Sequence, residues 1–191
     1  RVEVRAVTPI DGKSTQIKDY QSLPAGAEGE LIVSGPNIST AYYDDEKSTK
    51  KNKLYGEDGR VWHRLGDVGH VDEKGRVWVQ GRINQCVRLG DDLLLPISIE
   101  AKFDKHPKVR RSGLATRHNA QGKPEAVVAV EMKQGVGAAE KKSVLDELRA
   151  MAKQDPALAK VAEVVLLDKL PVDPRHNAKI ERGKLSKLLE K

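Results

Sequence analysis

Residues 64–82, RLGDVGHVDEKGRVWVQGR, carry the clearest structural signal in the first part of this chain. Two short alternating runs flank the polar turn DEKG, which is the pattern of a β-hairpin. Asp67 directly follows a glycine between two strands, so its carboxylate can turn out of the sheet and accept both hydrogens of a sugar diol. Most Gly-Asp pairs are simply turns, and that interpretation stays open on this evidence alone.

The residues before this hairpin also predict strands and turns, as VEVRAV (2–7) and GELIVSG (29–35) show. Between them and the hairpin, ISTAYYDDEKSTKKN (38–52) is more helical, with Asn37 or Ser39 as the expected N-cap. We expect Tyr42 and Tyr43 to pack that helix, and the charged run at 44–53 to form a solvated surface.

The pattern changes after Gly81. A short amphipathic helix within 93–107 precedes two strands, 109–118 and 124–134; a helix from about Ala138 to Lys153 then leads to a strand within 161–170 and a final short helix. The expected fold class is therefore α+β: a β-rich, barrel-like subdomain over 1–81, then a small α+β domain over 82–191 with a three-stranded sheet and flanking helices.

Composition places the chain among globular proteins of a reducing compartment. Of its 191 residues, 38% are hydrophobic and 32% are charged, with no apolar segment of membrane-spanning length and no signal peptide, so we expect a cytoplasmic protein. The single cysteine, Cys86, cannot form an internal disulfide, and no other zinc ligands cluster at ligand spacing, so no metal site is expected. Because the chain begins RVEVRAV, without methionine and inside a β-rich region, we expect a missing N-terminal part.

Charge divides at the same boundary. Residues 1–81 carry 12 Lys and Arg against 13 Asp and Glu, whereas residues 82–191 carry 22 against 15, a net charge of +7. A basic domain favours phosphate ligands, whether nucleotide, coenzyme or nucleic acid. Its only aromatic side chain is Phe103, so the stacking platforms typical of single-stranded nucleic acid binding are missing, and we expect no nucleic-acid partner. A non-catalytic basic phosphate-binding module remains the alternative from a different functional class.

Two further stretches bear on function. In PVDPRHNAKIERGKL (171–185), two prolines hold an extended loop, Asn177-Ala178 make a turn, and Lys179 is presented just before a helix. The simpler interpretation is a surface lysine in a final helix. Gly81-Arg82, at the domain boundary, combines backbone freedom with a fixed fork of donors, which favours a hinge.

Together these stretches resemble the closing motifs of the class I adenylate-forming (AMP-dependent synthetase and ligase) superfamily. GELIVSGPNISTAYY is similar to its G-E-[LI]-x-[VI]-x-G-x-x-[VI]-x-x-G-Y stretch, residues 64–82 to its T-G-D-[LV]-x-x-x-D-x-x-G-x-[LI]-x-x-x-G-R, and residues 171–185 to its P-x-x-x-x-G-K-[IV]-x-R. The resemblance covers nearly the whole chain. It implies the last barrel subdomain of the large N-terminal domain followed by the complete mobile C-terminal lid.

The resemblance also implies roles for individual residues. Asp67 would hold the ribose hydroxyls of ATP, Arg82 would contact the same ribose or the phosphates, and Lys179 would bridge the α-phosphate and the carboxylate of a small-molecule acid, with Mg²⁺ sharing the charge. The lid would rotate about a hinge near Asn84, within 82–85, for a second half-reaction. This fragment alone, without the N-terminal part of the pocket, would be inactive.

Departures from the family pattern leave the acyl acceptor open. The hinge position, usually Asp or Lys, is Asn84, and the stretch K-x-x-G-x-R of the acceptor tunnel reads RLGDDL over 88–93, with Leu93 where an arginine is usual. Coenzyme A, a carrier protein and the substrate's own hydroxyl are all compatible acceptors. The form RHNAKI (175–180) is similar to the β-lactone synthetases of olefin biosynthesis, while a fatty acyl-CoA or acyl-AMP ligase remains the main alternative.

The histidines suggest no catalytic base. His63, His70 and His118 have no partner that spacing identifies, and we expect surface or turn positions for them. His176 lies close to Lys179 in the sequence and could orient its loop, and Cys86 is expected to be a small buried side chain.

Overall fold

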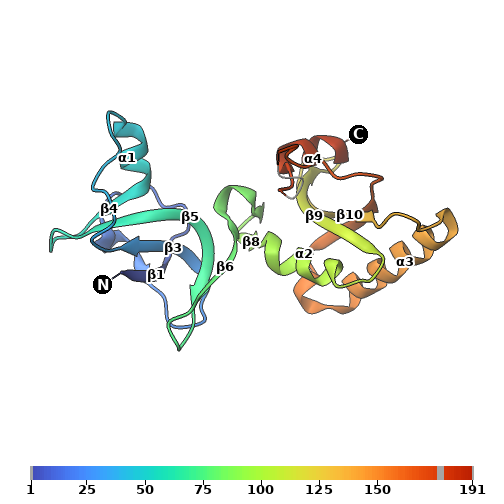
Figure 1. The fold of residues 1–191 in the computed structure, drawn as a ribbon, viewed down its shortest axis with the longest axis horizontal. Coiled ribbons are helices and arrows are strands. Elements are labelled where there is room, and N and C mark those ends of the chain that lie inside the picture. Colours follow the sequence, from blue (N-terminus) through green and yellow to red (C-terminus); the bar gives the residue numbers. More distant parts are fainter. Residues whose placement is uncertain (1, 176–178, 191) are drawn as a thin grey trace. The chain divides into compact units, whose positions relative to one another are not determined.

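The computed structural model describes residues 2–175 and 179–190 and divides the chain into two compact units, one ending at Asn84 and one beginning at Gln85 (Figure 1). The sequence placed the domain boundary between residues 81 and 82, within a few residues of this division. A hinge at 82–85 stays a prediction, as does any role for Asn84, which lies in a short 3₁₀ turn, Ile83–Gln85.

The first unit is built on one antiparallel sheet. Its six strands run in the order β2-β1-β3-β5-β4, and β6 also pairs with β5. The strands are β1 (Glu3–Thr8), β2 (Gln21–Ser22), β3 (Gly29–Ser34), β4 (Lys53–Tyr55), β5 (Val61–Val71) and β6 (Val77–Arg82).

The long strand β5 curls this sheet. Its first residues pair with β4, its middle with β3 and its last residues with β6. The backbone N–H of Tyr55 donates to the carbonyl of Thr15 at 2.8 Å, which ties β4 back to the segment after β1. The barrel-like curl and the hairpin at 64–82 were both predicted, and the α+β class is confirmed. The curl encloses a small core of Val7, Tyr20, Ile32, Leu54 and Trp62.

The helix of the first unit starts later than predicted. Helix α1 spans Glu46–Asn52, and its N-cap is Asp45, whose carboxylate accepts from the N–H of Ser48 at 2.8 Å. Asn37 and Ser39 are therefore not the cap. Asp44 has a φ of 48°, which no continuous right-handed helix can contain, so the chain must turn before α1 can begin.

The second unit has the expected order of elements. Its three-stranded sheet runs β11-β10-β9, with β9 and β10 antiparallel and β10 and β11 parallel. The elements are β7 (Val87–Leu89), β8 (Asp92–Leu94), α2 (Pro96–Asp104), β9 (Val109–His118), β10 (Pro124–Met132), α3 (Ala138–Gln154), β11 (Val161–Leu166) and α4 (Arg182–Leu189). No helix in the described part of the chain is both long and apolar enough to cross a bilayer.

Both faces of the three-stranded sheet are covered, because successive side chains of a strand point to opposite faces. Leu114 joins the large core that α2 and α3 complete with Phe103, Val144 and Leu148. Its neighbour Ala115 joins a smaller core on the other face, which α4 completes with Leu185 (Figure 1). The loop that carries Lys179 leads directly into α4, so this smaller core is its support.

Candidate functional site

Asp67 and Arg82 face each other across β5 and β6. They are register partners in the ladder, and Arg82 Nε lies 3.0 Å from the Asp67 carboxylate. Arg82 Nη1 also donates to the carbonyl of Leu65 at 2.9 Å. The Asp67 side chain is 17% exposed and that of Arg82 is 58% exposed, so one side of the carboxylate is covered and the guanidinium reaches solvent. The pair offers an acceptor-only group beside a fixed fork of donors.

A buried ion pair joins β3 to β5 close to Asp67 along the chain. Glu30 on β3 receives Arg64 Nε at 2.6 Å and Nη2 at 2.7 Å, and the two side chains are 1% and 7% exposed. The backbone N–H of Asp11 donates to the same carboxylate at 2.8 Å. Burial alone would lower the pKa of Arg64, but the hydrogen bonds and charge of Glu30 outweigh it and raise that pKa.

Sequence reasoning missed this pair, although both residues belong to quoted motifs. Arg64 precedes Asp67 by three residues on β5, and the β3–β5 register shifts between Glu30 and Ile32. The pair therefore holds the two strands together at a bulge close to Asp67. A charged residue inside the apolar stretch GELIVSG was the available signal.

Lys179 lies in the second unit, at the end of a loop closed by backbone contacts. Val172 and Ile180 form an isolated antiparallel bridge, and the N–H of Asp173 donates to the carbonyl of Lys179 at 2.9 Å. The N–H of Glu181 donates to the carbonyl of Pro171 at 2.9 Å. The Lys179 side chain is exposed, and no carboxylate of the described residues makes a salt bridge with it.

Asp173 carries the negative charge at the base of the loop. Its hydrogen bonds with Arg175 lower its pKa, and the nearby charges of Lys179 and Lys184 lower it further. Asp173 is therefore ionised at neutral pH and faces Arg175 directly, at 2.9 Å from its backbone N–H. The predicted turn at Asn177-Ala178 and the orienting role of His176 lie outside the described residues.

The β7–β8 hairpin contains the stretch that departs from the family pattern. Arg88 and Leu93 are register partners, and Gly90 turns the hairpin with a φ of 63°. Asp92, next to that turn, forms an ion pair with Lys160. Leu93 presents no cation at the position where the family usually has an arginine.

Each of the three histidines for which the sequence identified no partner makes a contact in the structure. His63 Nδ1 lies 3.1 Å from the carbonyl of Asn52, and His118 Nδ1 lies 2.9 Å from the Glu190 carboxylate. The His70 ring stacks on Trp78 at a centroid distance of 6.2 Å. None of these arrangements forms a catalytic pair with a nucleophile. Cys86 is half-buried.

The expectations for the region 42–53 hold in part: residues 44–52 of the charged run are exposed or half-exposed, but Tyr43 and Lys53 differ from what was expected. Tyr43 is fully exposed and so does not pack α1, whereas Tyr42 is 41% exposed and its backbone N–H donates to the hydroxyl of Thr49 on α1 at 2.9 Å. Lys53, at the end of the charged run, is only 2% exposed, and its ammonium donates to the carbonyl of Ser39 at 2.6 Å. The aliphatic stem of lysine can be covered when its ammonium finds an acceptor, which sequence position does not reveal.

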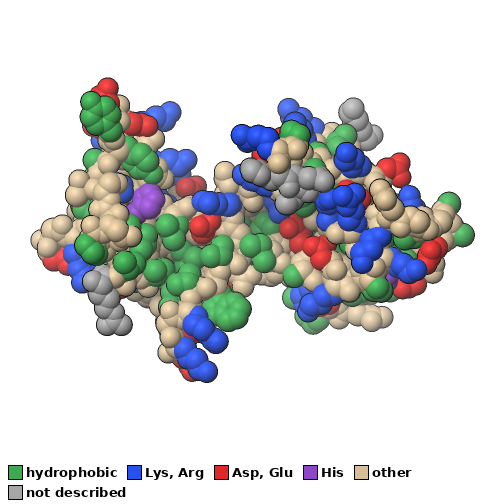
Figure 2. All heavy atoms as spheres, in the orientation of Figure 1, with side chains coloured by type: hydrophobic (Ala, Val, Ile, Leu, Met, Phe, Trp, Pro, Cys, Tyr) green, Lys and Arg blue, Asp and Glu red, His purple; other side chains and the backbone are tan. Residues whose placement is uncertain are grey.

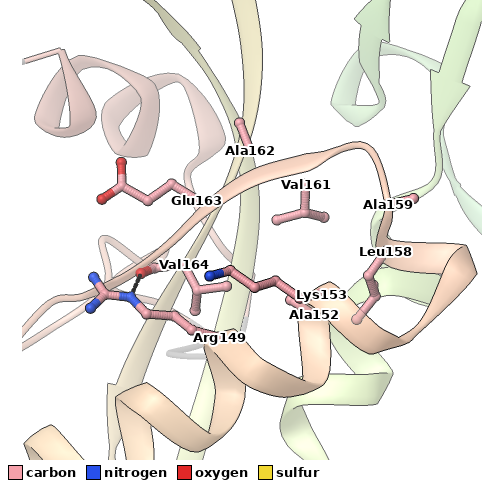
Figure 3. Close-up of a pocket in the computed structure, with 9 residues that line it drawn as sticks. All are labelled: Arg149, Ala152, Lys153, Leu158, Ala159, Val161, Ala162, Glu163 and Val164. Carbon is pink, nitrogen blue, oxygen red and sulfur yellow. Dashed lines mark hydrogen bonds between the residues drawn. The ribbon is translucent and has the colours of Figure 1, made fainter.

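A groove of about 500 Å³ lies between α3 and the edge strand β11 in the second unit (Figure 3). Its charged groups are largely bonded within the protein. Arg149 Nε donates to the carbonyl of Val164 at 3.1 Å, and Glu163 receives Arg117 Nη1 at 2.6 Å. The rest of its lining includes Ala152, Leu158 and Val161, so no set of reactive side chains converges there.

Charge and metal-ligating groups are spread out. Figure 2 shows Lys and Arg side chains over several parts of the visible face of the second unit, with Asp and Glu between them. Within residues 2–175 and 179–190, no three His, Cys, Asp or Glu side chains gather where they could hold a metal ion. The candidate positions are therefore Asp67 and Arg82, which the structure brings together, and Lys179, which it presents on the other unit.

Comparison with known proteins identifies the family. The olefin beta-lactone synthetase of Xanthomonas campestris pv. campestris is 36% identical over 188 residues, which are 96% of this chain and 34% of that protein. The 2-succinylbenzoate--CoA ligase of Bacillus cytotoxicus is 33% identical over 97 residues, 51% of this chain and 19% of that protein. No protein-family profile matches the chain.

Solved structures show the same fold. The ATP-bound RpMatB-BxBclM chimera B1 has a TM-score of 0.76 and 24% identity, covering 99% of this chain and 34% of that one. ATP-bound MatB from Rhodopseudomonas palustris has a TM-score of 0.72 and 25% identity, with the same coverage. This chain thus spans about a third of the length of the relatives that it matches. As its motifs predicted, the chain belongs to the class I adenylate-forming superfamily and matches the C-terminal portion of its members.

Proposed function

We propose that this chain is the C-terminal part of an ATP-dependent ligase that activates a carboxylic acid, a fatty acid in our preferred form, as an acyl-adenylate with release of pyrophosphate. One observation carries the proposal: Lys179 of the P-x-x-x-x-G-K-like motif is exposed, free of salt bridges to the described residues, and held at the end of a backbone-closed loop. The 36% identity to an olefin beta-lactone synthetase over 96% of the chain supports it.

The proposed role of Lys179 follows from the charge that develops. An acid oxygen attacks the α-phosphorus of ATP, the bond to the bridging oxygen breaks, and negative charge grows on the nonbridging oxygens as pyrophosphate leaves. A preorganised ammonium at this point is worth roughly 3–4 kcal/mol, or about 10²–10³ in rate. The loop closure at Asp173 and Glu181 lets the Lys179 backbone be placed before the reaction begins.

Asp67 and Arg82 are proposed to bind the nucleotide. An ionised carboxylate can accept from both hydroxyls of the ATP ribose, and Arg82, already oriented by Asp67 and the Leu65 carbonyl, can donate to ribose or phosphate oxygens. When bound, Mg²⁺ would help neutralise the phosphate charge. Because the described residues offer no cluster for a metal ion, we assign Mg²⁺ to no side chain of this chain.

We further propose that the second unit rotates about a hinge near Asn84 between two half-reactions. The division of the chain between Asn84 and Gln85 supports a hinge at this point. Such a rotation would withdraw Lys179 after adenylation and let one small domain serve a second chemistry.

For the acceptor, the alternative of a β-lactone synthetase acting on a β-hydroxy fatty acid has its own support. The relative with 36% identity bears that name. In addition, the β7–β8 hairpin pairs Arg88 with Leu93 and carries Asp91 and Asp92, so it offers few cations to the phosphates of coenzyme A. In this alternative the β-hydroxyl attacks the acyl-adenylate carbonyl and AMP leaves.

The test measures pyrophosphate release by the longer protein that carries this chain, with fatty acids and β-hydroxy fatty acids, each with and without coenzyme A. We expect Lys179→Ala to lose about two orders of magnitude. Lys187→Ala removes another exposed lysine, on α4, and should have no effect. Unchanged release in Lys179→Ala would refute the proposed role, and dependence of product formation on coenzyme A would separate the thioester from the lactone. The 191-residue chain alone is expected to release none.

A further inference from the structure

The first residue of α4, Arg182, is clamped to the helix α2 on the same unit. Arg182 Nη1 lies 2.5 Å from one carboxylate oxygen of Glu100, and Nη2 lies 3.0 Å from the other. This is the bidentate arrangement in which a guanidinium fixes both the distance and the orientation of its partner. The side chains are only 16% and 12% exposed, so little solvent competes for the pair.

The same pair includes the backbone of β9. Arg182 Nη1 donates to the carbonyl of Leu114 at 2.7 Å, and the N–H of Leu114 donates to the Glu100 carboxylate at 2.6 Å. Two side chains and the backbone N–H and carbonyl of one residue, Leu114, therefore join α2, β9 and α4 at a single point. Arg182 Nε is buried without a hydrogen-bond partner among the described residues, so the two terminal nitrogens provide the whole clamp.

This clamp lies at the foot of the Lys179 loop. Only Ile180 and Glu181 separate Lys179 from Arg182, and the N–H of Glu181 closes the loop onto Pro171. Ile180 itself packs in the small core on the α4 face of the sheet, with Leu170 and Leu185.

Gly113 on β9 lets the loop approach the sheet closely. A Cβ at this position would lie 2.9 Å from methyl carbons of both Leu170 and Leu185 and 3.2 Å from Ile180. A side chain here would force these methyl groups to shift from their present packing against the sheet. Gly113 and the Glu100–Arg182 pair thus hold the loop in one position against the sheet, which we call the seat of the loop.

We propose that Glu100 and Arg182 are positioning residues for acid activation: they fix the loop so that the Lys179 ammonium is presented at one place. This inference rests on the proposed function, because it assigns the clamp to the reaction that Lys179 is proposed to assist. Neither residue touches substrate in the proposal; each acts through the loop. A shift of about 1 Å in such a group can cost up to about 10²-fold in rate.

The first arm of the test needs no activity and uses the 191-residue chain. Glu100→Gln keeps the shape and an acceptor but loses the charge, and Arg182→Lys keeps the charge but loses the fork. We expect both variants to speed amide exchange at Asp173 and Glu181, which close the loop, by about 10-fold or more. Glu163→Gln, which weakens the Arg117–Glu163 pair between β9 and β11, should leave these two amides unchanged.

The second arm is a double-mutant cycle in the longer protein. Glu100→Gln should slow pyrophosphate turnover by about 10- to 100-fold with a smaller change in KM for ATP, and in the Lys179→Ala background it should cause no further loss. The positioning role would be overturned if the rate losses of Glu100→Gln and Lys179→Ala multiplied in the double variant. It would also be overturned if amide exchange at Asp173 and Glu181 stayed unchanged. If Lys179→Ala has no effect while loop exchange still accelerates, the seat stands but its link to catalysis, and the proposed function with it, is refuted.

Discussion

The carboxylate of Asp67 and the Nε of Arg82 lie 3.0 Å apart, across a register pair that joins the middle of β5 to the last residue of β6. The contact links the candidate ribose acceptor to a residue two positions before Asn84, the last residue of the first unit. Each side chain can therefore orient the other.

Asp67→Ala is expected to raise KM for ATP in the longer protein by at least about 10-fold, because the ribose would lose its charged acceptor. Stability should change by less than about 1 kcal/mol, since Arg82 is 58% exposed and its ion pair is screened by solvent. Initial-rate kinetics and thermal unfolding measure the two quantities. Glu3→Gln, which weakens a surface pair with Arg60, is the control; equal KM values for both variants would contradict a role in nucleotide binding.

Glu30→Gln should destabilise the first unit by roughly 3–5 kcal/mol, because it leaves the buried charge of Arg64 without its counter-charge. Urea unfolding followed by tryptophan fluorescence isolates this unit, since both tryptophans, Trp62 and Trp78, lie in it. Glu57→Gln breaks an exposed pair with Lys18 and should cost less than about 1 kcal/mol. A similar small loss for Glu30→Gln would show that the buried pair does not stabilise the sheet.

Gly69→Ala should separate β5 from β6. A Cβ at Gly69 would lie 2.0 Å from the carbonyl oxygen of Trp78, so the strands must move apart, and we expect a loss of at least about 1–3 kcal/mol in the same urea experiment. Gly183 in α4 has no atom within 4 Å of an added Cβ. Gly183→Ala should instead raise the thermal stability of the second unit, measured by circular dichroism, by about 0.5–1 kcal/mol. Destabilisation by both changes to the same extent would contradict the close contact at Trp78.

The stability of the first unit should fall as pH drops through about 6.5, the ordinary pKa of histidine. Burial, aided by the charge of Lys53, lowers the pKa of His63 in the folded chain. Between the lowered and the ordinary pKa, the unfolded chain binds more protons than the folded one, so the free energy of unfolding rises with pH, by less than the limit of about 1.4 kcal/mol per pH unit for one proton.

Tryptophan-monitored urea unfolding between pH 5 and 8 measures this dependence. Replacing His63 with Gln should reduce the slope, whereas replacing the exposed His118 in the other unit should leave it unchanged. An identical slope in wild type and His63→Gln would assign the dependence to other groups.

The fold class and the order of the elements could be predicted from local sequence patterns. The β-hairpin at 64–82 and the paired strands at 109–118 and 124–132 were readable because alternation and turn residues act over a few positions. The motifs that contain Asp67, Arg82 and Lys179 could be recognised in the sequence for the same reason, because each spans only a short stretch of the chain.

Local sequence patterns failed to predict the start of α1, because several residues before it could act as the N-cap. The segment 37–49 offers many capping side chains, and the positive φ of Asp44, rather than side-chain chemistry, decided that α1 begins at Glu46. The burial of Lys53 likewise depended on the Ser39 carbonyl, which the fold brings to its ammonium.

The long-range ion pairs could not be predicted before the fold was known. Glu30 and Arg64 are 34 residues apart, and Glu100 and Arg182 are 82 residues apart, so no local pattern links them. The first pair depends on the register of β3 and β5, and the second depends on the packing of α2 and α4 on two faces of one sheet. A charged side chain in the sequence shows that a partner is required if it is buried, but burial itself is a property of the whole fold.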